Sequence, residues 1–268
     1  LNGVLGVAAL MERQLTQEDL RPHVRTILDS GQSLLRLLND ALDMSRAQSG
    51  ALSLEVAPTH LDALIADLQA LWGPRAEEKG LLLATEVDTI GHDWVMADAV
   101  RLKQLLNNLV GNALKFTQAG EVRVTLRSVW HDGAVRVEAQ IDDSGPGIPA
   151  EARASIFEPF NTGEAGREGA GAGLGLAICR QIVERMGGII EVAESPQGGA
   201  RFHFRLDLPR AGPEMRAEHE AMAEPTPHET LHVLVVDDNA TNRFVAGKLL
   251  ETFGCTAAYA EDGRQAVA

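Results

Sequence analysis

Three polar side chains share one face of the helix predicted for residues 98–115. In the stretch DAVRLKQLLNNLVGNALKFT, Asn108, Asn112 and Lys115 fall within a narrow stripe at 100° per residue, opposite a row of apolar residues. Asparagine is a poor helix former, so two of them four residues apart are unusual as surface filler. Amide oxygens are hard ligands that suit Mg²⁺, and a lysine ammonium screens phosphate charge. The stripe indicates a site for a magnesium-bound polyphosphate, with a solvated helix face as the alternative.

Two glycine-rich segments follow this helix in the sequence. DSGPGI, residues 143–148, comes after a predicted strand, and its Asp143 could accept a hydrogen bond from an exocyclic amine such as adenine N6. GAGAGLGLAI, residues 169–178, opens a predicted helix and could present backbone N–H groups to phosphate. It is neither a lysine-bearing P-loop nor a convincing dinucleotide fingerprint, because no Gly-Lys-Ser/Thr follows and no strand directly precedes it. The alternatives are a Gly-Pro turn and a flexible linker.

Two amphipathic helices are predicted at the start of the chain, over residues 1–15 and 19–49. In the second helix, one seam recurs at alternating spacings of four and three residues, as in a coiled coil. The seam consists of Val24, Leu28, Gly31, Leu35, Leu38, Leu42 and Ser45. Two such helices form half of a four-helix bundle, and dimerisation would supply the other half. A hairpin that packs on its own chain is the alternative.

The middle of the chain alternates predicted strands and helices. We expect strands over residues 51–58, 81–88, 94–98, 121–130, 134–143, 189–195 and 200–208. We expect helices over residues 59–79, capped by Thr59, over residues 98–115 and over residues 174–188. The turn HDG between two long strands predicts a hairpin. This pattern predicts an α/β sandwich, in which an antiparallel-rich sheet carries helices on one face.

The C-terminal part begins a separate β-α-β unit. Residues 210–230 are acidic, contain proline and are poor in large apolar side chains, as in a flexible linker. The following strand, HVLVV, is apolar throughout, which predicts a buried parallel strand. Asp237 and Asp238 follow it directly. Paired carboxylates at the carboxyl end of such a strand suit Mg²⁺, and solvent-facing acids are the alternative.

Composition limits the classes of partner. The 268-residue chain has a formal net charge of −14, which argues against non-specific binding to nucleic acid or to anionic membranes. Its two cysteines, Cys179 and Cys255, are expected to be reduced thiols. No apolar run has the length of a membrane span. We therefore expect a cytoplasmic segment without membrane contact of its own, although an anchor elsewhere in a longer protein stays open.

The order of the motifs resembles the nucleotide-binding boxes of histidine kinases. NNLVGNALKFT is similar to the N box, DDSGPGI to the first G box, IFEPF to the F box and GAGAGLGLAI to the second G box. The resemblance implies a multidomain hybrid histidine kinase. Its parts would be dimerisation and phosphotransfer helices (1–50), a GHKL-type (Bergerat) ATP-binding sandwich (51–209), a linker (210–230) and the start of a doubly wound receiver domain (231–268).

The resemblance also implies roles for single residues. Asn108 and Asn112 would ligate Mg²⁺, with Asn108 and Lys115 acting on the phosphates of ATP. Asp143 would read adenine N6, and Asp237 and Asp238 would hold Mg²⁺ in the receiver. Further residues would shape the adenine pocket, anchor a lid over ATP or wrap the phosphates: Phe116, Gly145, Gly147, Ile148, Phe157, Phe160, Gly171, Gly173, Leu174, Gly175 and Leu176. Ala172 departs from the family's frequent threonine or serine, which removes a hydroxyl contact but leaves the backbone cradle.

The implied activity is phosphoryl transfer from ATP to a histidine, followed by relay to a receiver aspartate. The resemblance places that histidine a few residues before Leu1 and that aspartate beyond Ala268, and none of the eight histidines of the chain lies in a matching motif. The implied partners are a second copy through residues 1–50, a receiver domain of the same or the partner chain, and a downstream phosphotransfer protein or response regulator. The alternatives are another GHKL-type ATPase that works as a conformational switch, and a degenerate kinase that serves as a scaffold.

Overall fold

A five-stranded sheet forms the centre of the larger compact unit, which spans residues 40–223. The computed structural model describes residues 2–14, 20–48, 53–161, 173–213, 215 and 231–267. The strand order is β2 (Leu82–Asp88), β4 (Glu121–His131), β5 (Ala134–Asp143), β7 (Ala200–Leu208), β6 (Ile189–Glu194). Strands β2 and β4 are parallel and the other three pairs are antiparallel, with β4 and β5 joined as the predicted hairpin. The prediction of an antiparallel-rich sheet is confirmed.

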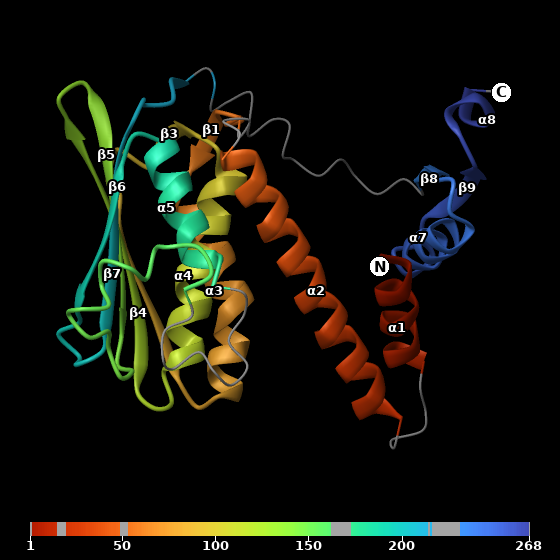
Figure 1. Cartoon of the computed structure of the whole chain (residues 1–268). Coiled ribbons are helices and arrows are strands. Elements are labelled where there is room, and N and C mark those ends of the chain that lie inside the picture. Colours follow the sequence, from red (N-terminus) through yellow and green to blue (C-terminus); the bar gives the residue numbers. More distant parts are fainter. Residues whose placement is uncertain are drawn as a thin grey trace. The chain divides into compact units, whose positions relative to one another are not determined.

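Three helices, α3 (Leu61–Glu78), α4 (Ala99–Phe116) and α5 (Gly175–Arg185), cover one face of this sheet (Figure 1). The strands alternate accordingly, since every second residue of β4 and β5 is buried beneath the helices. The opposite face carries charged side chains that pair across strands. Arg201 binds both carboxylate oxygens of Asp142, at 2.6 and 2.8 Å, and Arg136 binds Asp207 in the same way. The sheet thus needs no second layer on that face.

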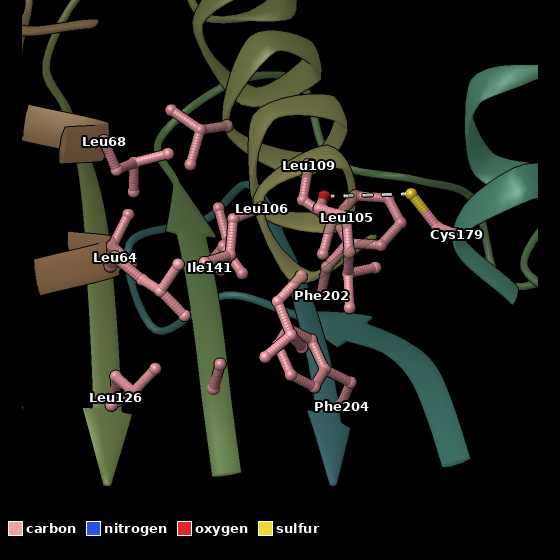
Figure 2. Packing of buried hydrophobic residues seen from close by; sticks show 14 of the residues in the cluster. Leu64, Leu68, Leu105, Leu106, Leu109, Leu126, Ile141, Cys179, Phe202 and Phe204 are labelled. Atoms are coloured by element: carbon pink, nitrogen blue, oxygen red, sulfur yellow. Dashed lines mark hydrogen bonds between the residues drawn. The ribbon is translucent and has the colours of Figure 1, made fainter. Parts of the chain in front are cut away.

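The hydrophobic core lies between the helices and the sheet (Figure 2). Leu105, Leu106 and Leu109 of α4 are at most 2% exposed and meet Phe202 and Phe204 of β7. Leucines of α4 spaced by three and four residues therefore form the buried stripe that the sequence predicts. Cys179 of α5 is a buried free thiol whose Sγ lies 3.9 Å from the carbonyl oxygen of Leu105.

The entry into α3 differs from the prediction. The first strand, β1 (Ala57–His60), is shorter than expected and pairs with β3 (Trp94–Ala97) in a separate two-stranded sheet. The assignment of Thr59 as the helix cap is wrong, because Thr59 lies inside β1 and His60 occupies the cap position. The Thr59 hydroxyl donates to backbone carbonyls of β1 and β3 instead, so it joins the two strands. Capping a helix is only one use of such a hydroxyl.

The N-terminal helices α1 (Asn2–Gln14) and α2 (Arg21–Gln48) form a hairpin. Val24 and Leu28 of α2 are buried against Ala8 of α1, and Leu5 packs where Gly31 leaves room for it. The first half of the predicted seam is therefore used inside the hairpin. Its second half is exposed, with Leu38 at 50% and Leu42 at 54%. The side chain of Ser45 lies outside the described part of the chain.

The C-terminal segment is a β-α-β unit as predicted: β8 (His232–Val236), α7 (Ala240–Thr252) and β9 (Thr256–Ala260), followed by α8 (Gly263–Val267). Strands β8 and β9 are parallel. The expectation that β8 is fully buried is wrong, because Leu234 and Val236 are nearly half exposed. The faces of a parallel sheet are buried only where helices cover them, and here part of the two-stranded sheet is left exposed. None of the described helices is both long and apolar enough to span a lipid bilayer.

Candidate nucleotide-binding site

The carboxylate of Asp143 lies at the end of β5, in a residue that is 5% exposed. Its Oδ1 accepts two backbone hydrogen bonds, from Gly145 N at 2.9 Å and from Ala200 N at 3.0 Å. Its Oδ2 has no hydrogen-bond partner within the described residues. Burial raises the pKa of Asp143 above the ordinary value for aspartate, and the two N–H donors only partly oppose this. One oxygen is thus fixed by the fold, and the other remains available to a ligand.

Close backbone packing surrounds this carboxylate. Gly199, in the turn before β7, lies so near that a Cβ on it would collide with both Oδ1 and the carbonyl oxygen of Asp143. A Cβ on Gly145 would stand 3.0 Å from Asp143 Oδ1 and 3.2 Å from the carbonyl oxygen of Phe116. Gly147 has a φ of +72°, which side chains rarely adopt. Gly145 and Gly199 therefore let the backbone approach the acid, and Gly147 lets the chain adopt a positive φ. The predicted role of Gly145 and Gly147 in shaping an adenine pocket stays a prediction.

The asparagine face of α4 lies against the start of α5. Asn108 Nδ2 donates to the carbonyl oxygen of Gly175 at 3.4 Å, so its amide is directed toward that helix terminus. Asn112, one turn later, is half-buried, and Lys115 is exposed with its Nζ 5.2 Å from the Phe116 ring centroid. The three side chains share one face, as predicted. The neighbouring Asn107 instead accepts a hydrogen bond from Trp72 Nε1 at 2.9 Å, which makes it a structural residue.

Backbone contacts join residues 160 and 161 to Gly173, which lies just before α5. Phe160 N donates to the carbonyl oxygen of Gly173 at 3.0 Å, and a Cβ on Gly173 would stand 2.9 Å from the carbonyl oxygen of Asn161. Phe160 has a φ of +63°, a strained value for an aromatic residue. Its ring is 72% exposed, whereas Phe157 is buried and meets Phe202 edge-on. Only Phe157 has the burial expected of an anchor.

The remaining predicted pocket residues divide into two groups. Leu174 is 3% exposed and its side chain belongs to the core, so its cofactor-binding role stays a prediction. Ile148 and Leu176 are partly buried at the edge of the core, and Phe116 is 38% exposed. Gly171 lies outside the described residues. The predicted roles of these residues toward a nucleotide stay predictions.

The carboxylates after β8 differ from each other. Asp237 accepts hydrogen bonds from Asn239 N and from Asn242 Nδ2, which hold it against the start of α7. Arg243 donates to the backbone carbonyl oxygen of Asp237 at 2.6 Å. Within the described residues, no group of three potential metal ligands comes together here or elsewhere. The predicted Mg²⁺ role of Asp237 and Asp238 stays a prediction.

Comparisons with known proteins agree with this geometry. The family model described as "Histidine kinase-, DNA gyrase B-, and HSP90-like ATPase" matches residues 97–210, and "His Kinase A (phospho-acceptor) domain" matches residues 1–50. The autoinducer 2 sensor kinase/phosphatase LuxQ of Vibrio cholerae is 35% identical over 273 residues, covering 100% of this chain and 32% of LuxQ. The chain belongs to the histidine kinases.

Other relatives support the same assignment. The sensor histidine kinase AruS of Pseudomonas aeruginosa is 37% identical over 271 residues, covering 100% of this chain and 27% of AruS. The crystal structure of full-length ShkA in complex with AMPPNP has a TM-score of 0.64 and 36% identity, covering 99% of this chain and 54% of ShkA. Acinetobacter baumannii AdeS, at 21% identity and a TM-score of 0.56, shows the fold alone. The chain spans about a third or less of the two curated relatives, LuxQ and AruS.

The residues of this histidine kinase fit the ATP that the family binds. Asp143 Oδ2 is an acceptor without a partner in the described part of the chain, as an exocyclic amine requires. The glycines beside it avoid the close contacts that a Cβ would make with this carboxylate. The first turn of α5 supplies backbone N–H groups near Asn108, where phosphate is favoured. Asn108 and Asn112 offer the amide oxygens that suit Mg²⁺.

Sequence reasoning missed two parts of this site, the turn before β7 and the residue that follows α4. Gly199 and the N–H of Ala200 come from a turn more than fifty positions after Asp143, and only the pairing of β5 with β7 brings them together. Thr117, just after α4, is 1% exposed and contacts the same region. The available signal for the first was the glycine pair in QGGARF, since a simple turn needs only one glycine.

Substitution of Asp143 by asparagine should separate binding from stability. The new amide can still accept both backbone hydrogen bonds at Oδ1, but it presents an N–H₂ donor to the adenine amine. We expect Asp143→Asn to weaken Mg·ADP binding about 10- to 100-fold in calorimetric titrations. Thermal melting should show a stability equal to or above that of the unmodified chain, because no charge is buried. Unchanged affinity would contradict the assignment of Asp143.

The pH dependence should follow the raised pKa of Asp143. The folded protein binds this proton more tightly than the unfolded chain does, so the contribution of the group to stability decreases as pH rises through the interval between the two pKa values. ADP affinity should fall on acidification at a higher pH than an ordinary aspartate would give. The Asp143→Asn variant should lack this phase.

Substitution of Gly199 by alanine should displace Asp143. The new Cβ would collide with the Asp143 carboxylate and stand 2.7 Å from Gly145 N, so the backbone must shift. We expect at least a roughly 10-fold loss of ADP affinity or a destabilisation of about 1–3 kcal/mol. Gly198→Asn is the control, because no atom lies within 4 Å of a Cβ there and asparagine tolerates positive φ. Equal behaviour of the two variants would contradict the close approach.

Proposed function

We propose that this chain is the dimerisation and ATP-binding core of a hybrid histidine kinase of two-component signalling. It would bind Mg·ATP and transfer the γ-phosphoryl group to a histidine, from which the group would pass to a receiver aspartate. The observation that carries the proposal is Asp143, a buried residue whose Oδ1 is fixed by two backbone N–H groups while its Oδ2 is left for a ligand. A carboxylate in this state can accept a hydrogen bond from the adenine amine.

The asparagine face would bind the phosphate end of the nucleotide. The Nδ2 of Asn108 is bound to the carbonyl oxygen of Gly175, which leaves its Oδ1 to act as a metal ligand. Asn112 follows one turn along and would be a second ligand. Lys115, at the exposed end of α4, would neutralise phosphate charge, and the N–H groups at the start of α5 would add to it. Asn108 and Asn112 would hold Mg²⁺, which would supply positive charge against the phosphates.

The helical hairpin would associate with a second copy to form a four-helix bundle. Apolar side chains of α2 remain about half exposed on the hairpin, among them Ile27, Leu34, Leu38 and Leu42. Monomeric proteins rarely expose such a continuous apolar row along one helix. In a left-handed bundle these residues would fill the central seam.

The C-terminal β-α-β unit would be the beginning of a receiver domain. Its parallel strands and the acid pair after β8 have the arrangement in which an α/β sheet binds Mg²⁺ at the carboxyl ends of its strands. Relay would then proceed from histidine to a receiver aspartate and on to a downstream phosphotransfer protein or response regulator.

A charge in the exposed seam should prevent dimerisation. Leu38 is 50% exposed on the hairpin, so Leu38→Asp should leave the hairpin folded but place two carboxylates in an apolar interface. We expect the dimer dissociation constant to rise on the order of 100-fold or more in sedimentation or light scattering. Ser33→Asp is the control, because Ser33 is exposed on a different side of α2. A monomeric unmodified chain would refute the bundle.

The 268-residue chain should bind ATP without being phosphorylated. Its eight histidines lie outside the phosphoacceptor motif, and transfer requires an imidazole held in line with the terminal phosphorus. We expect no acid-labile label after incubation with γ-labelled ATP and Mg²⁺. A version extended at its N-terminus by the family's histidine motif should become labelled. Label on the 268-residue chain would send the search back to its own histidines.

A further inference from the structure

We propose that Thr117 selects the base, its hydroxyl donating a hydrogen bond to the ring nitrogen beside the amine that Asp143 recognises. This inference rests on the proposed ATP-binding function and adds a residue to it. Directly or through one water, the Thr117 hydroxyl and the Asp143 carboxylate would form one polar pair that reads the N1–N6 edge of adenine.

The first observation is an unpartnered buried hydroxyl. Thr117 ends α4, and its N–H is bound to the carbonyl oxygen of Ala113, so its backbone is fixed. The side chain is 1% exposed, and its Oγ1 makes no hydrogen bond to any described residue. Buried polar groups in folded proteins are nearly always paired, so such an exception indicates a missing water or ligand.

The second observation is where this hydroxyl lies. A Cβ placed on Gly145 would stand 3.4 Å from Thr117 Oγ1, 3.0 Å from Asp143 Oδ1 and 3.2 Å from the carbonyl oxygen of Phe116. The three oxygens therefore lie close together beside Gly145, and the absence of a side chain at this residue keeps them from being crowded. Polar atoms gathered in this way can bind a water or the polar edge of a base.

The chemistry of the pair matches adenine. Adenine presents a donor, its C6 amine, beside an acceptor, N1. A carboxylate that accepts and a hydroxyl that donates complement this edge. Guanine presents the reverse order, an acceptor at O6 beside a donor at N1, and would set its O6 against the carboxylate of Asp143. A site built to hydrogen-bond particular groups rejects analogues that lack them, because its own buried polar atoms then stay unpaired.

The test compares two nucleotides in calorimetric titrations of the full 268-residue chain. Mg·ADP carries N1, and Mg·1-deaza-ADP lacks N1 but retains the amine. Thr117→Val keeps the shape and removes the hydroxyl. We expect it to bind ADP about 10-fold more weakly than the unmodified chain does. Both proteins should bind 1-deaza-ADP equally. The effect of the hydroxyl would then depend on the presence of N1, and a merely structural role would not produce this dependence. Thr117→Ser should restore most of the ADP affinity.

The controls separate this inference from the proposed function. Thr125→Val makes the same change on the sheet face away from the helices and should bind both nucleotides normally. Asp143→Asn should lose affinity for both nucleotides. If Thr117→Val binds ADP as tightly as the unmodified chain, or loses both nucleotides equally, Thr117 does not read N1 while the proposed function stands. If the unmodified chain binds neither nucleotide, both proposals fall.

Discussion

The structure of the site depends on one buried carboxylate. Taking an aspartate out of water is costly, and the raised pKa of Asp143 expresses that cost. Two backbone N–H groups offset part of it. That of Gly145 comes from the local turn, and that of Ala200 comes from a distant segment that the pairing of β5 with β7 brings close. The neighbouring acid, Asp142, is bound bidentately by Arg201 on the opposite face of the sheet. The two adjacent acids are therefore treated differently: one is neutralised within the fold, and the other keeps an oxygen without a partner among the described residues.

The rest of the catalytic unit serves this arrangement. Strand β7 must pair with β5 in a register that sets Arg201 opposite Asp142, because this places the N–H of Ala200 beside Asp143. The helices that cover the sheet bury their leucines in the core, which fixes the axial rotation of α4 and directs Asn108 toward the start of α5. The position of each polar group in the site is thus a consequence of apolar packing behind it. This explains why α4 carries a polar stripe on one side and an apolar stripe on the other.

The sequence predicted most of the fold and about half of the site's physical basis. Periodicity placed α4, β4 and β5 because most of their apolar residues recur at the spacing of a helix or a strand, and local motifs pointed to Asp143 and the glycines next to it. Prediction failed where a residue had two local uses: Thr59 resembles a helix cap but joins two strands. The places of Gly199 and Thr117 in the site were missed, since they arise from contacts between segments far apart in sequence, and only the glycine pair in QGGARF gave a local signal.

Two polar atoms of this site, Asp143 Oδ2 and Thr117 Oγ1, have no hydrogen-bond partner among the described residues. The cost of leaving the buried Thr117 hydroxyl unsatisfied reduces the stability of the unliganded domain. A ligand that supplies the missing partners therefore returns this free energy as affinity and stabilises the folded state increasingly as its concentration rises. A ligand whose base edge cannot make these hydrogen bonds would bind without this gain in affinity. Under the proposal, selectivity for the base would follow from hydrogen bonds that the fold leaves unmade, more than from shape.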